Sequence, residues 1–237
     1  MPDCSDNYAV LLAAGSGRRM GAAVEDKILV CLGGKPVLRH SVEAFQQSAC
    51  VSRICIVYRD GAQRERLEAA LNSPPQSDLP ILWARGGSTR RESVANGLNA
   101  LPGSGGLTFI HDAARPLVTA AALSELAAVA ERDGAACLAH RLVDTIKRVE
   151  VPEQIRRVEL EDLERNRLWA METPQVFRTE AIRKAYRQVM ALGLDVTDDA
   201  AAAATIGLPL TLVPNEKPNP KITTDADLSY LEWLLTS

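Results

Sequence analysis

Several features that would classify this 237-residue chain at once are missing from its sequence. Its five cysteines are scattered, odd in number and never spaced as Cys-x-x-Cys, which excludes a regular disulfide framework and a zinc site of that kind. We expect free, mostly buried thiols in a reducing compartment. No apolar run approaches the ~20 residues of a membrane helix, and residues 1–8 are too polar for a signal peptide. The sequence predicts a cytoplasmic protein without a membrane segment.

The chain also lacks a basic excess, with 27 Lys and Arg against 30 Asp and Glu and a net charge of −3. Surfaces that bind nucleic acid or anionic membranes normally show the opposite bias, so we expect no nucleic-acid and no membrane partner. Basic residues that bind an anion must therefore converge locally. Hydrophobic residues make up 46% of the chain, enough to bury a full core. This length suits one α/β domain, residues 1–237, with an insertion.

Short β-type runs alternate with segments of helical periodicity, the pattern of a mostly parallel sheet flanked by helices. The first helix should begin at Pro36, and Thr89 with Glu92 forms a capping box for another. Strands are expected at 8–14, 53–58, 79–84, 107–110, 135–139, 173–177 and 208–213. The further helices are expected at 61–71, 119–132, 180–190, 198–206 and from 224 onward.

Residues 142–169 break this alternation with charged stretches that fit neither a core strand nor an amphipathic helix. We expect an extended β-arm that projects from the domain. A lone hairpin is marginally stable in water, so the arm needs a partner. A second copy of the same chain is the simplest partner, which predicts a homodimer.

A glycine- and arginine-rich loop follows the first predicted strand, running from Gly15 through Gly17 and Arg19. It is neither a P-loop, because no Lys-Ser or Lys-Thr follows the second glycine, nor a dinucleotide fingerprint, because Met20 occupies the third glycine position. Its backbone N–H groups and cations can face a polyphosphate. Arg19 and Lys27 are thus candidates for electrostatic catalysis, with ordinary solvated loop cations as the alternative.

Two more polar clusters follow predicted strands, at the sheet edge where ligands of parallel sheets bind. Gly86-Gly87 could bring backbone close to a flat base, or could form an ordinary turn. Asp112 could hold a ribose hydroxyl or a magnesium-bound phosphate, but it could equally cap a helix or pair with Arg115. Lys221 is either another phosphate-binding residue or a surface lysine.

The usual nucleophilic machinery is missing as well, because the three histidines have no Gly-x-Ser-x-Gly or paired-carboxylate context. A phosphate oxygen that attacks phosphorus is already deprotonated and needs no general base. Such a reaction needs positioning and positive charge around the transferred group. A glycine-rich turn, Arg, Lys and Mg²⁺ would be a sufficient set.

Together these motifs resemble the 2-C-methyl-D-erythritol 4-phosphate cytidylyltransferase family of the non-mevalonate isoprenoid pathway. The segment His111-Asp-Ala-Ala-Arg-Pro116, with the glycine-arginine loop, is characteristic of this family and of its pentitol-phosphate cytidylyltransferase relatives. The matching segments occur in order over residues 8–235, at 13–20, 26–27, 86–94, 111–116, 144–147, 165–169, 173–175 and 221–223.

The resemblance implies a Rossmann-like nucleotidyltransferase fold and a homodimer whose arm reaches into the neighbouring subunit. It implies a reaction between CTP and the sugar-alcohol phosphate, with Mg²⁺ carried mainly by the CTP phosphates. By position, Arg19 and Lys27 would stabilise the α-phosphorus, while Arg165, Lys221 and Thr145 would hold the acceptor. The implied nucleotide-binding residues are Ala13, Ala14, Gly15, Gly17, Gly87, Ser93, Asp112, Ala113 and Arg115.

The chain departs from the family pattern at four positions. Ile28 replaces a usual Gln, Ser88 an Asp, and Arg167 a frequent Gly, while Pro220 stiffens the approach to Lys221. The nucleotide loops do not separate methylerythritol phosphate from ribitol 5-phosphate as the acceptor. A non-catalytic nucleotide-binding domain on the same sheet is a third hypothesis, although a sensor has little use for cations around a reacting phosphorus.

Overall fold

The computed structural model describes residues 6–15, 26–72, 79–149 and 160–236 of the chain. The strands are β1 (Tyr8–Leu12), β2 (Cys31–Leu32), β3 (Lys35–Pro36), β4 (Arg53–Tyr58), β5 (Ile81–Arg85), β6 (Leu107–Asp112), β7 (Ala135–Arg141), β8 (Lys147–Val149), β9 (Leu160–Asp162), β10 (Trp169–Arg178) and β11 (Thr211–Pro214). The helices are α1 (Val37–Ser48), α2 (Gly61–Asn72), α3 (Arg90–Ala100), α4 (Ala120–Asp133), the 3₁₀ turn η2 (Arg165–Arg167), α5 (Thr179–Leu192), α6 (Asp199–Ala204) and α7 (Asp225–Thr236).

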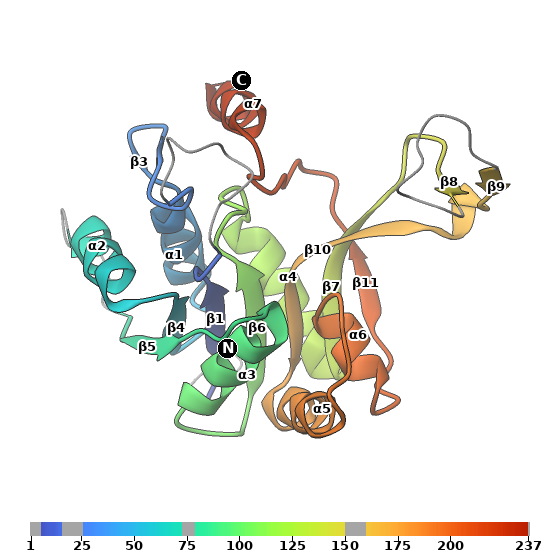
Figure 1. The fold of residues 1–237 in the computed structure, drawn as a ribbon, viewed down its shortest axis with the longest axis horizontal. Helices are drawn as coiled ribbons and strands as arrows, with labels where there is room; N and C mark the ends of the chain where they lie inside the picture. Colours follow the sequence, from blue (N-terminus) through green and yellow to red (C-terminus); the bar gives the residue numbers. More distant parts are fainter. Residues whose placement is uncertain (1–5, 16–25, 73–78, 150–159, 237) are drawn as a thin grey trace.

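The centre of the molecule is a seven-stranded sheet in the order β11-β7-β10-β6-β1-β4-β5 (Figure 1). The pairs β1–β4, β1–β6, β4–β5 and β7–β11 are parallel. Strand β10 runs antiparallel to both of its neighbours, β6 and β7. The prediction of a mostly parallel sheet flanked by helices is confirmed.

Helices cover both faces of the sheet. Successive side chains of a strand point to opposite faces, so the apolar residues of a strand need helices on both sides to bury them. In β1, Ala9 and Leu11 belong to the core cluster shared with α1, α2, α4 and α7. Tyr8 and Val10 point the other way, into the cluster shared with α3, α5 and α6. Strand β1 is therefore buried on both faces, and its carboxyl end lies near the middle of one edge of the sheet.

Local sequence signals set several helix ends as expected. Pro36 precedes the first residue of α1, and the predicted stripe of Leu38, Val42 and Phe45 is buried. The capping box of α3 is complete, with Thr89 and Glu92 each accepting from the other's backbone N–H. Helix α4 ends at Gly134, whose φ of 90° favours glycine.

Several strand ends, and the burial of one helix, differ from the sequence-based expectation. Strand β1 ends at Leu12 rather than residue 14, so Ala13 and Ala14 belong to the following loop. Strand β5 begins at Ile81, and β10 starts as early as Trp169. Helix α2 was expected to be a charged surface helix, but Gln63 and Leu67 on it are fully buried.

Within residues 142–169, β8 and β9 pair as an antiparallel hairpin that projects from the main body (Figure 1). Ion pairs join the two strands, between Lys147 and Asp162 and, at 2.9 Å, between Arg148 and Glu161. Residues 150–159 of the predicted arm lie outside the described residues. At the base of the hairpin, the Arg141 guanidinium lies 4.5 Å from the Trp169 ring centre, a cation–π contact.

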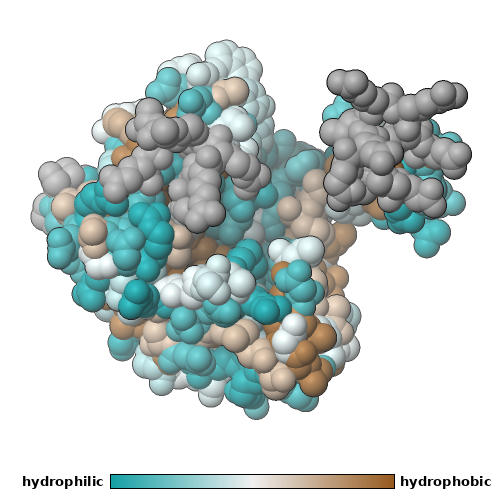
Figure 2. All heavy atoms as spheres, viewed as in Figure 1, coloured by the Kyte–Doolittle hydropathy of each residue, from teal (hydrophilic) through white to brown (hydrophobic). Residues whose placement is uncertain are grey.

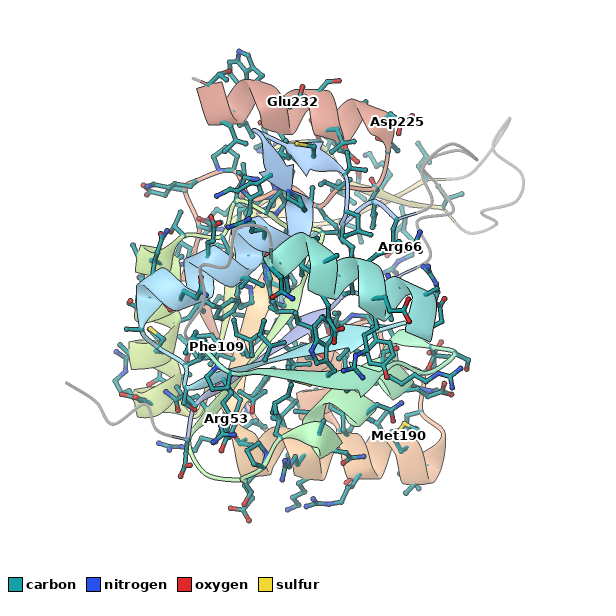
Figure 3. The ribbon with its side chains drawn as sticks, turned by 90° about the vertical axis from the view of Figure 1, so that its left-hand side faces the viewer. Arg53, Arg66, Phe109, Met190, Asp225 and Glu232 are labelled. Atoms are coloured by element: carbon teal, nitrogen blue, oxygen red, sulfur yellow. The ribbon has the colours of Figure 1, made fainter. Side chains whose placement is uncertain are left out.

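The described surface in Figure 2 is mostly hydrophilic or mixed, and its strongest hydrophobic colour gathers around α5. Figure 3 shows α7, marked by Asp225 and Glu232, lying across the top of the molecule next to the β2–β3 hairpin. None of the described helices is both long and apolar enough to cross a bilayer.

Three cysteines, Cys50, Cys55 and Cys137, are free and buried as expected. Burial raises the pKa of the Cys55 and Cys137 thiols to about 12, so both are unreactive at neutral pH. Cys31 departs from the expectation, because the short strand β2 leaves it exposed. Cys4 lies outside the described residues.

Candidate active site

Strand register brings the candidate residues to one edge of the sheet. Leu12 of β1 is level with Val57 of β4 on one side and with Asp112 of β6 on the other. The three strands therefore end together, and the loops after them open into a cavity of about 530 Å³. This is the carboxyl edge at which ligands of open parallel sheets bind.

Eight residues predicted from the sequence line this pocket, although they come from five segments of the chain. These residues are Ala13, Ala14, Gly15, Lys27, Gly87, Ser93, Asp112 and Lys221. Gly17 and Arg19 lie outside the described residues, so their positions stay predictions. Ala113 is fully buried behind the wall, and the Arg115 side chain bonds to the Asn219 carbonyl instead of lining the pocket.

The Asp112 carboxylate lies between two cations. Lys221 Nζ donates to Asp112 Oδ2 at 2.5 Å, and Arg90 Nη2 is 3.8 Å from Oδ1. Burial alone would raise the pKa of Asp112, but the charges of Lys221 and Arg90 outweigh it and hold that pKa below its ordinary value. The expected alternative, an ion pair between Asp112 and Arg115, is not what forms; Lys221 takes that place.

Lys27 joins the first loop to the last. Its ammonium donates to the carbonyl of Ile222 at 2.7 Å, a contact between residues 195 positions apart. The Ile222 N–H in turn donates to the Ala114 carbonyl at 2.9 Å. Lys27 is therefore fixed to the residue next to Lys221, and both lysines line the same pocket.

The two glycines after β5 allow a close approach of backbone at the pocket. A Cβ on Gly86 would lie 2.9 Å from both the Ala14 Cβ and the Ser93 Oγ, and one on Gly87 would lie 2.2 Å from the Glu92 Cβ. The Ser93 hydroxyl accepts from the Gly87 N–H at 3.1 Å and donates to the Thr89 carbonyl at 2.9 Å. This turn is thus packed directly against Ala14, in a way that leaves no room for side chains at residues 86 and 87.

A buried ion pair supports the same wall from below. Arg90 donates to both carboxylate oxygens of Asp199, at 3.0 and 2.7 Å, and the Tyr186 hydroxyl donates to Asp199 Oδ1 at 2.5 Å. Burial lowers the pKa of Arg90, but the Asp199 charge more than reverses this, so Arg90 stays a cation. Arg90 is held by α6 and presented to Asp112.

His111 precedes Asp112 and is completely buried. Its Nε2 lies 3.1 Å from the Arg115 carbonyl, which can only accept, so Nε2 carries the proton and Nδ1 accepts from the Thr173 hydroxyl at 3.1 Å. The Thr173 oxygen also accepts from the Asp112 N–H at 3.0 Å. Burial lowers the pKa of His111 to about 4, so this histidine is neutral and holds the Asp112 loop in place.

Another buried carboxylate, Glu172, holds the segment before Lys221. Glu172 Oε2 accepts from the side-chain amides of Asn215 and Asn219, both at 2.9 Å, while Oε1 lies 2.6 Å from His140 Nδ1. His140 is on β7 and Glu172 on β10, the two strands that run into the projecting hairpin. Asn219 and Pro220 therefore form part of a fixed approach to Lys221.

The predicted acceptor residues of the hairpin do not reach this pocket within the chain. Thr145 and Arg165 are exposed, and Arg165 Nη1 donates to the Val143 carbonyl at 2.6 Å. Neither residue is among those that line the cavity. Of the four cations predicted for the reaction, the described pocket of one chain holds Lys27 and Lys221 and lacks Arg165, while Arg19 lies outside the described residues.

The family model for 2-C-methyl-D-erythritol 4-phosphate cytidylyltransferase (IspD) matches residues 8–237. The chain belongs to this family. It is 38% identical to the Synechococcus elongatus enzyme of that name, over 96% of this chain and 95% of the relative. The Dehalococcoides mccartyi enzyme is 39% identical, over 96% of this chain and 95% of its own length.

Solved structures of the family share the fold. The Francisella tularensis 2-C-methyl-D-erythritol 4-phosphate cytidylyltransferase aligns over 97% of this chain and 100% of its own, with a TM-score of 0.80 and 29% identity. The Thermus thermophilus enzyme of the same name aligns over 97% of this chain and 98% of its own, with a TM-score of 0.75 and 29% identity.

Sequence reasoning did not single out some of the residues that line the pocket of this family member. Arg59, directly after β4, lies on its wall, and so does Ile28, which the sequence analysis noted only as a departure from the family pattern. Gln63 was missed as well: its amide donates to the Ala13 carbonyl and to Asp26 Oδ1, both at 3.0 Å. The one hint in the sequence was that Gln63 is an uncharged polar residue in a helix rich in charged ones.

Among the described residues that line the pocket, Asp112 is the one with a carboxylate. It is poorly placed to bind a metal ion directly. Lys221 and Arg90 already supply two positive charges to it. The described residues contain no group of three His, Cys, Asp or Glu side chains able to hold a metal ion. The described part of the pocket therefore offers no ready-made group of metal ligands.

Proposed function

We propose that this chain transfers the cytidylyl group of CTP to 2-C-methyl-D-erythritol 4-phosphate, giving 4-diphosphocytidyl-2-C-methyl-D-erythritol and pyrophosphate. A phosphate oxygen of the acceptor attacks the α-phosphorus of CTP, the bond to the bridging oxygen breaks, and pyrophosphate leaves with the electron pair. The observation that carries this proposal is that Lys27 and Lys221 line one pocket, with Lys221 bonded to Asp112 and Lys27 bonded to the residue after Lys221. Two cations from distant segments suit two phosphate groups that must react with each other.

Each part of the pocket has a role in this reaction. The flat turn at Gly86-Gly87 with Ala14 receives the cytosine, and Asp112 accepts from a ribose hydroxyl. Lys27, together with Arg19, stabilises the negative charge that builds up on the α-phosphate oxygens. Lys221 holds the acceptor phosphate for attack. No general base is needed, which fits a buried His111 whose two ring nitrogens are both occupied.

The proposal includes Mg²⁺, which would enter the site bound to the phosphates of CTP. It would neutralise phosphate charge and favour the departure of pyrophosphate. The two cations at Asp112 support this assignment, because they leave the carboxylate little capacity for a direct metal bond. The protein's own contribution is the orientation of the nucleotide and the fixed positive charge of its side chains.

We further propose that the active unit is a cytoplasmic homodimer in which Thr145 and Arg165 act on the acceptor in the partner's pocket. The projecting hairpin exposes Val143 and Leu160, 84% and 58% accessible, as an interface segment would before its partner covers it. Its residues Thr145 and Arg165 do not line the pocket of their own chain. The buried free thiols are in keeping with a reducing compartment.

The reaction is tested by a panel of four nucleoside triphosphates against methylerythritol phosphate and ribitol 5-phosphate, with and without Mg²⁺. Pyrophosphate should be released rapidly only from CTP with methylerythritol phosphate and Mg²⁺ together. Faster turnover with ribitol 5-phosphate would assign the other acceptor. CTP binding without turnover with either acceptor would leave a nucleotide-binding domain and reject the enzyme.

The shared site is tested by mixing two inactive variants, Lys27→Met and Arg165→Met. Each mixed dimer joins one intact pocket to one intact arm, so random reassociation should restore about one quarter of the wild-type activity. Either variant reassociated with itself serves as the control and should stay inactive. No recovery in the mixture would mean that Arg165 acts within its own chain.

A further inference from the structure

Arg59 is a pocket cation that neither the sequence motifs nor the proposed reaction uses. It follows β4 directly, and its side chain lines the cavity together with Lys27. The side chain is 29% exposed, enough to meet a ligand while its stem is packed. The position is set by β4, whose neighbour β1 ends beside it in the Ala13–Gly15 loop.

The Arg59 guanidinium is held in place by two carboxylates. Its Nε donates to Asp60 Oδ2 at 2.9 Å, and its Nη2 donates to Asp26 Oδ2 at 3.3 Å. Among the residues that the structure describes, Nη1 has no hydrogen-bond partner, so N–H donors remain for a ligand. An arginine fixed by carboxylates on one edge can bind an oxyanion with the other edge at little entropic cost.

Gln63 fixes the backbone of Arg59 as well as the segment of Lys27. The buried amide accepts from the Arg59 N–H at 2.6 Å and donates to Asp26 Oδ1 and to the Ala13 carbonyl, both at 3.0 Å. Asp26 directly precedes Lys27, whose ammonium reaches the Lys221 segment at Ile222. Lys27 therefore lies between two groups, with Arg59 on its Asp26 side and Lys221 on its Ile222 side.

Neutralising Asp26 does not by itself account for Arg59. Asp26 already accepts from Gln63, and Arg66 Nη2 lies 3.7 Å from its Oδ2. Burial raises the pKa of Asp26, and its bond to Gln63 and the charges of Arg59 and Arg66 offset only part of that rise. Asp26 thus has other partners, and Arg59 keeps N–H donors for a ligand after pairing with Asp26 and Asp60.

We propose that Arg59 binds the outer phosphates of the nucleoside triphosphate, the part that leaves as pyrophosphate. The nucleotide's identity rests on the proposed function; the phosphate contact rests on the geometry of this chain. Lys27 and Lys221 face the reacting centre, and Arg59 extends the row of cations away from the acceptor side. A guanidinium there both tightens triphosphate binding and favours the leaving group.

The test compares Arg59→Gln with Arg53→Gln, a matched control at the opposite end of the same strand. Arg53 is exposed and level with Tyr8, at the amino edge of the sheet (Figure 3). The dissociation constants of CTP and CMP are measured by calorimetry with Mg²⁺ present and no acceptor. Arg59→Gln should weaken CTP about tenfold to a hundredfold and CMP less than about twofold, the scale of hydrogen bonds to charged groups. Arg53→Gln should change neither.

Two results would overturn the assignment. Equal weakening of CTP and CMP would place Arg59 at the base, the ribose or the pocket frame, and unchanged CTP affinity would leave it as a structural partner of Asp26. If Arg59→Gln does not fold, the uncharged variant Arg59→Met carries the same comparison with the same criteria. Failure of the wild type to bind CTP would instead reject the proposed function, so the two failures are distinct.

Discussion

Lys221 and Asp112 are 109 residues apart in the sequence, yet the ammonium of one donates to the carboxylate of the other at 2.5 Å. Asp112 ends β6, whereas Lys221 lies in the segment between β11 and α7. This ion pair holds the segment between β11 and α7 against the pocket. It also places the Lys221 ammonium beside the proposed reaction centre. Its consequences can be measured for both catalysis and stability.

Replacing Lys221 with Met should impair use of the acceptor more than use of CTP. The variant removes the cation assigned to the acceptor phosphate, and charge-assisted hydrogen bonds of this kind are worth about 1.5–3 kcal/mol, so kcat/KM for the acceptor should fall about tenfold to a hundredfold. The exposed Lys217 of the same segment provides the control, Lys217→Met, with kinetics close to wild type. Equal losses for both substrates would contradict the assignment.

The same variant should change how stability depends on pH. The pKa of Asp112 is depressed in the folded protein by Lys221 and Arg90, so its stabilising contribution is present above the unfolded pKa of about 3.9 and is lost as pH falls through the folded value. Lys221→Met should therefore cost more stability at pH 7 than at pH 3. Urea unfolding at both values measures this, and a cost independent of pH would show that Asp112 is not stabilised by Lys221.

Replacing Lys27 with Met should lower kcat with little effect on the fold. Removing one fixed donor to the transition state typically costs about 10²–10³ in kcat, and Lys27 is assigned that role at the α-phosphate. Lys35→Met is the matched control, because Lys35 pairs with Glu43 on α1 and does not line the pocket. Single-turnover rates with saturating CTP measure the chemical step directly. A near-normal rate for Lys27→Met would remove this lysine from the mechanism.

Local elements of this fold could be predicted because their signals are contained in a few neighbouring residues. Strand β4 has the expected bounds, and α3 begins with the expected box of Thr89 and Glu92. The candidate pocket was predictable to the extent that polar clusters follow parallel strands, whose carboxyl ends must share an edge. Ser93 and Lys27 therefore lie where strand order places them.

Pairings across the chain could not be predicted in the same way. The one ion-pair partner proposed for Asp112 from the sequence was Arg115, three residues away. The fold instead turns Arg115 toward the Asn219 carbonyl and brings Lys221 to Asp112. Gln63 shows the same limit, because its burial depends on where α2 packs rather than on any period within α2. Arg59 was missed because its role depends on Gln63 and Asp26.

Asp199 should contribute strongly to stability, because it holds Arg90 in its position at the pocket. Removing one partner of a buried ion pair typically costs about 3–5 kcal/mol, and because the Arg90 side chain is 30% exposed we expect Asp199→Asn to lie near the lower end. Tyr186→Phe removes only the hydroxyl bond to Asp199 and should cost about 1 kcal/mol. Urea unfolding gives both free energies, and CTP binding should weaken in Asp199→Asn as Arg90 moves. A variant as stable as wild type would mean that Arg90 finds other partners.

His111 should make the protein sensitive to mild acid. Its folded pKa of about 4 lies below the unfolded value of about 6.5, so protonation favours the unfolded chain. The stabilising contribution is complete above pH 6.5 and is lost as pH falls toward 4, by up to about 3 kcal/mol at 1.36 kcal/mol per pKa unit. His40, whose pKa burial also lowers, acts in the same direction, so a variant is needed to isolate His111.

His111→Asn provides that variant, because Asn cannot take up the proton. At pH 7 it should be less stable than wild type, since the bonds to Thr173 and Arg115 are lost or lengthened. As pH falls from 6.5 to 4, the difference in unfolding free energy should shrink, because only the wild type loses stability through residue 111. His40 titrates in both proteins and cancels from the difference. If the difference in unfolding free energy stays constant over this range, His111 has the same pKa in the folded and unfolded protein. The description of His111 as a neutral imidazole with a hydrogen bond at each ring nitrogen would then be wrong.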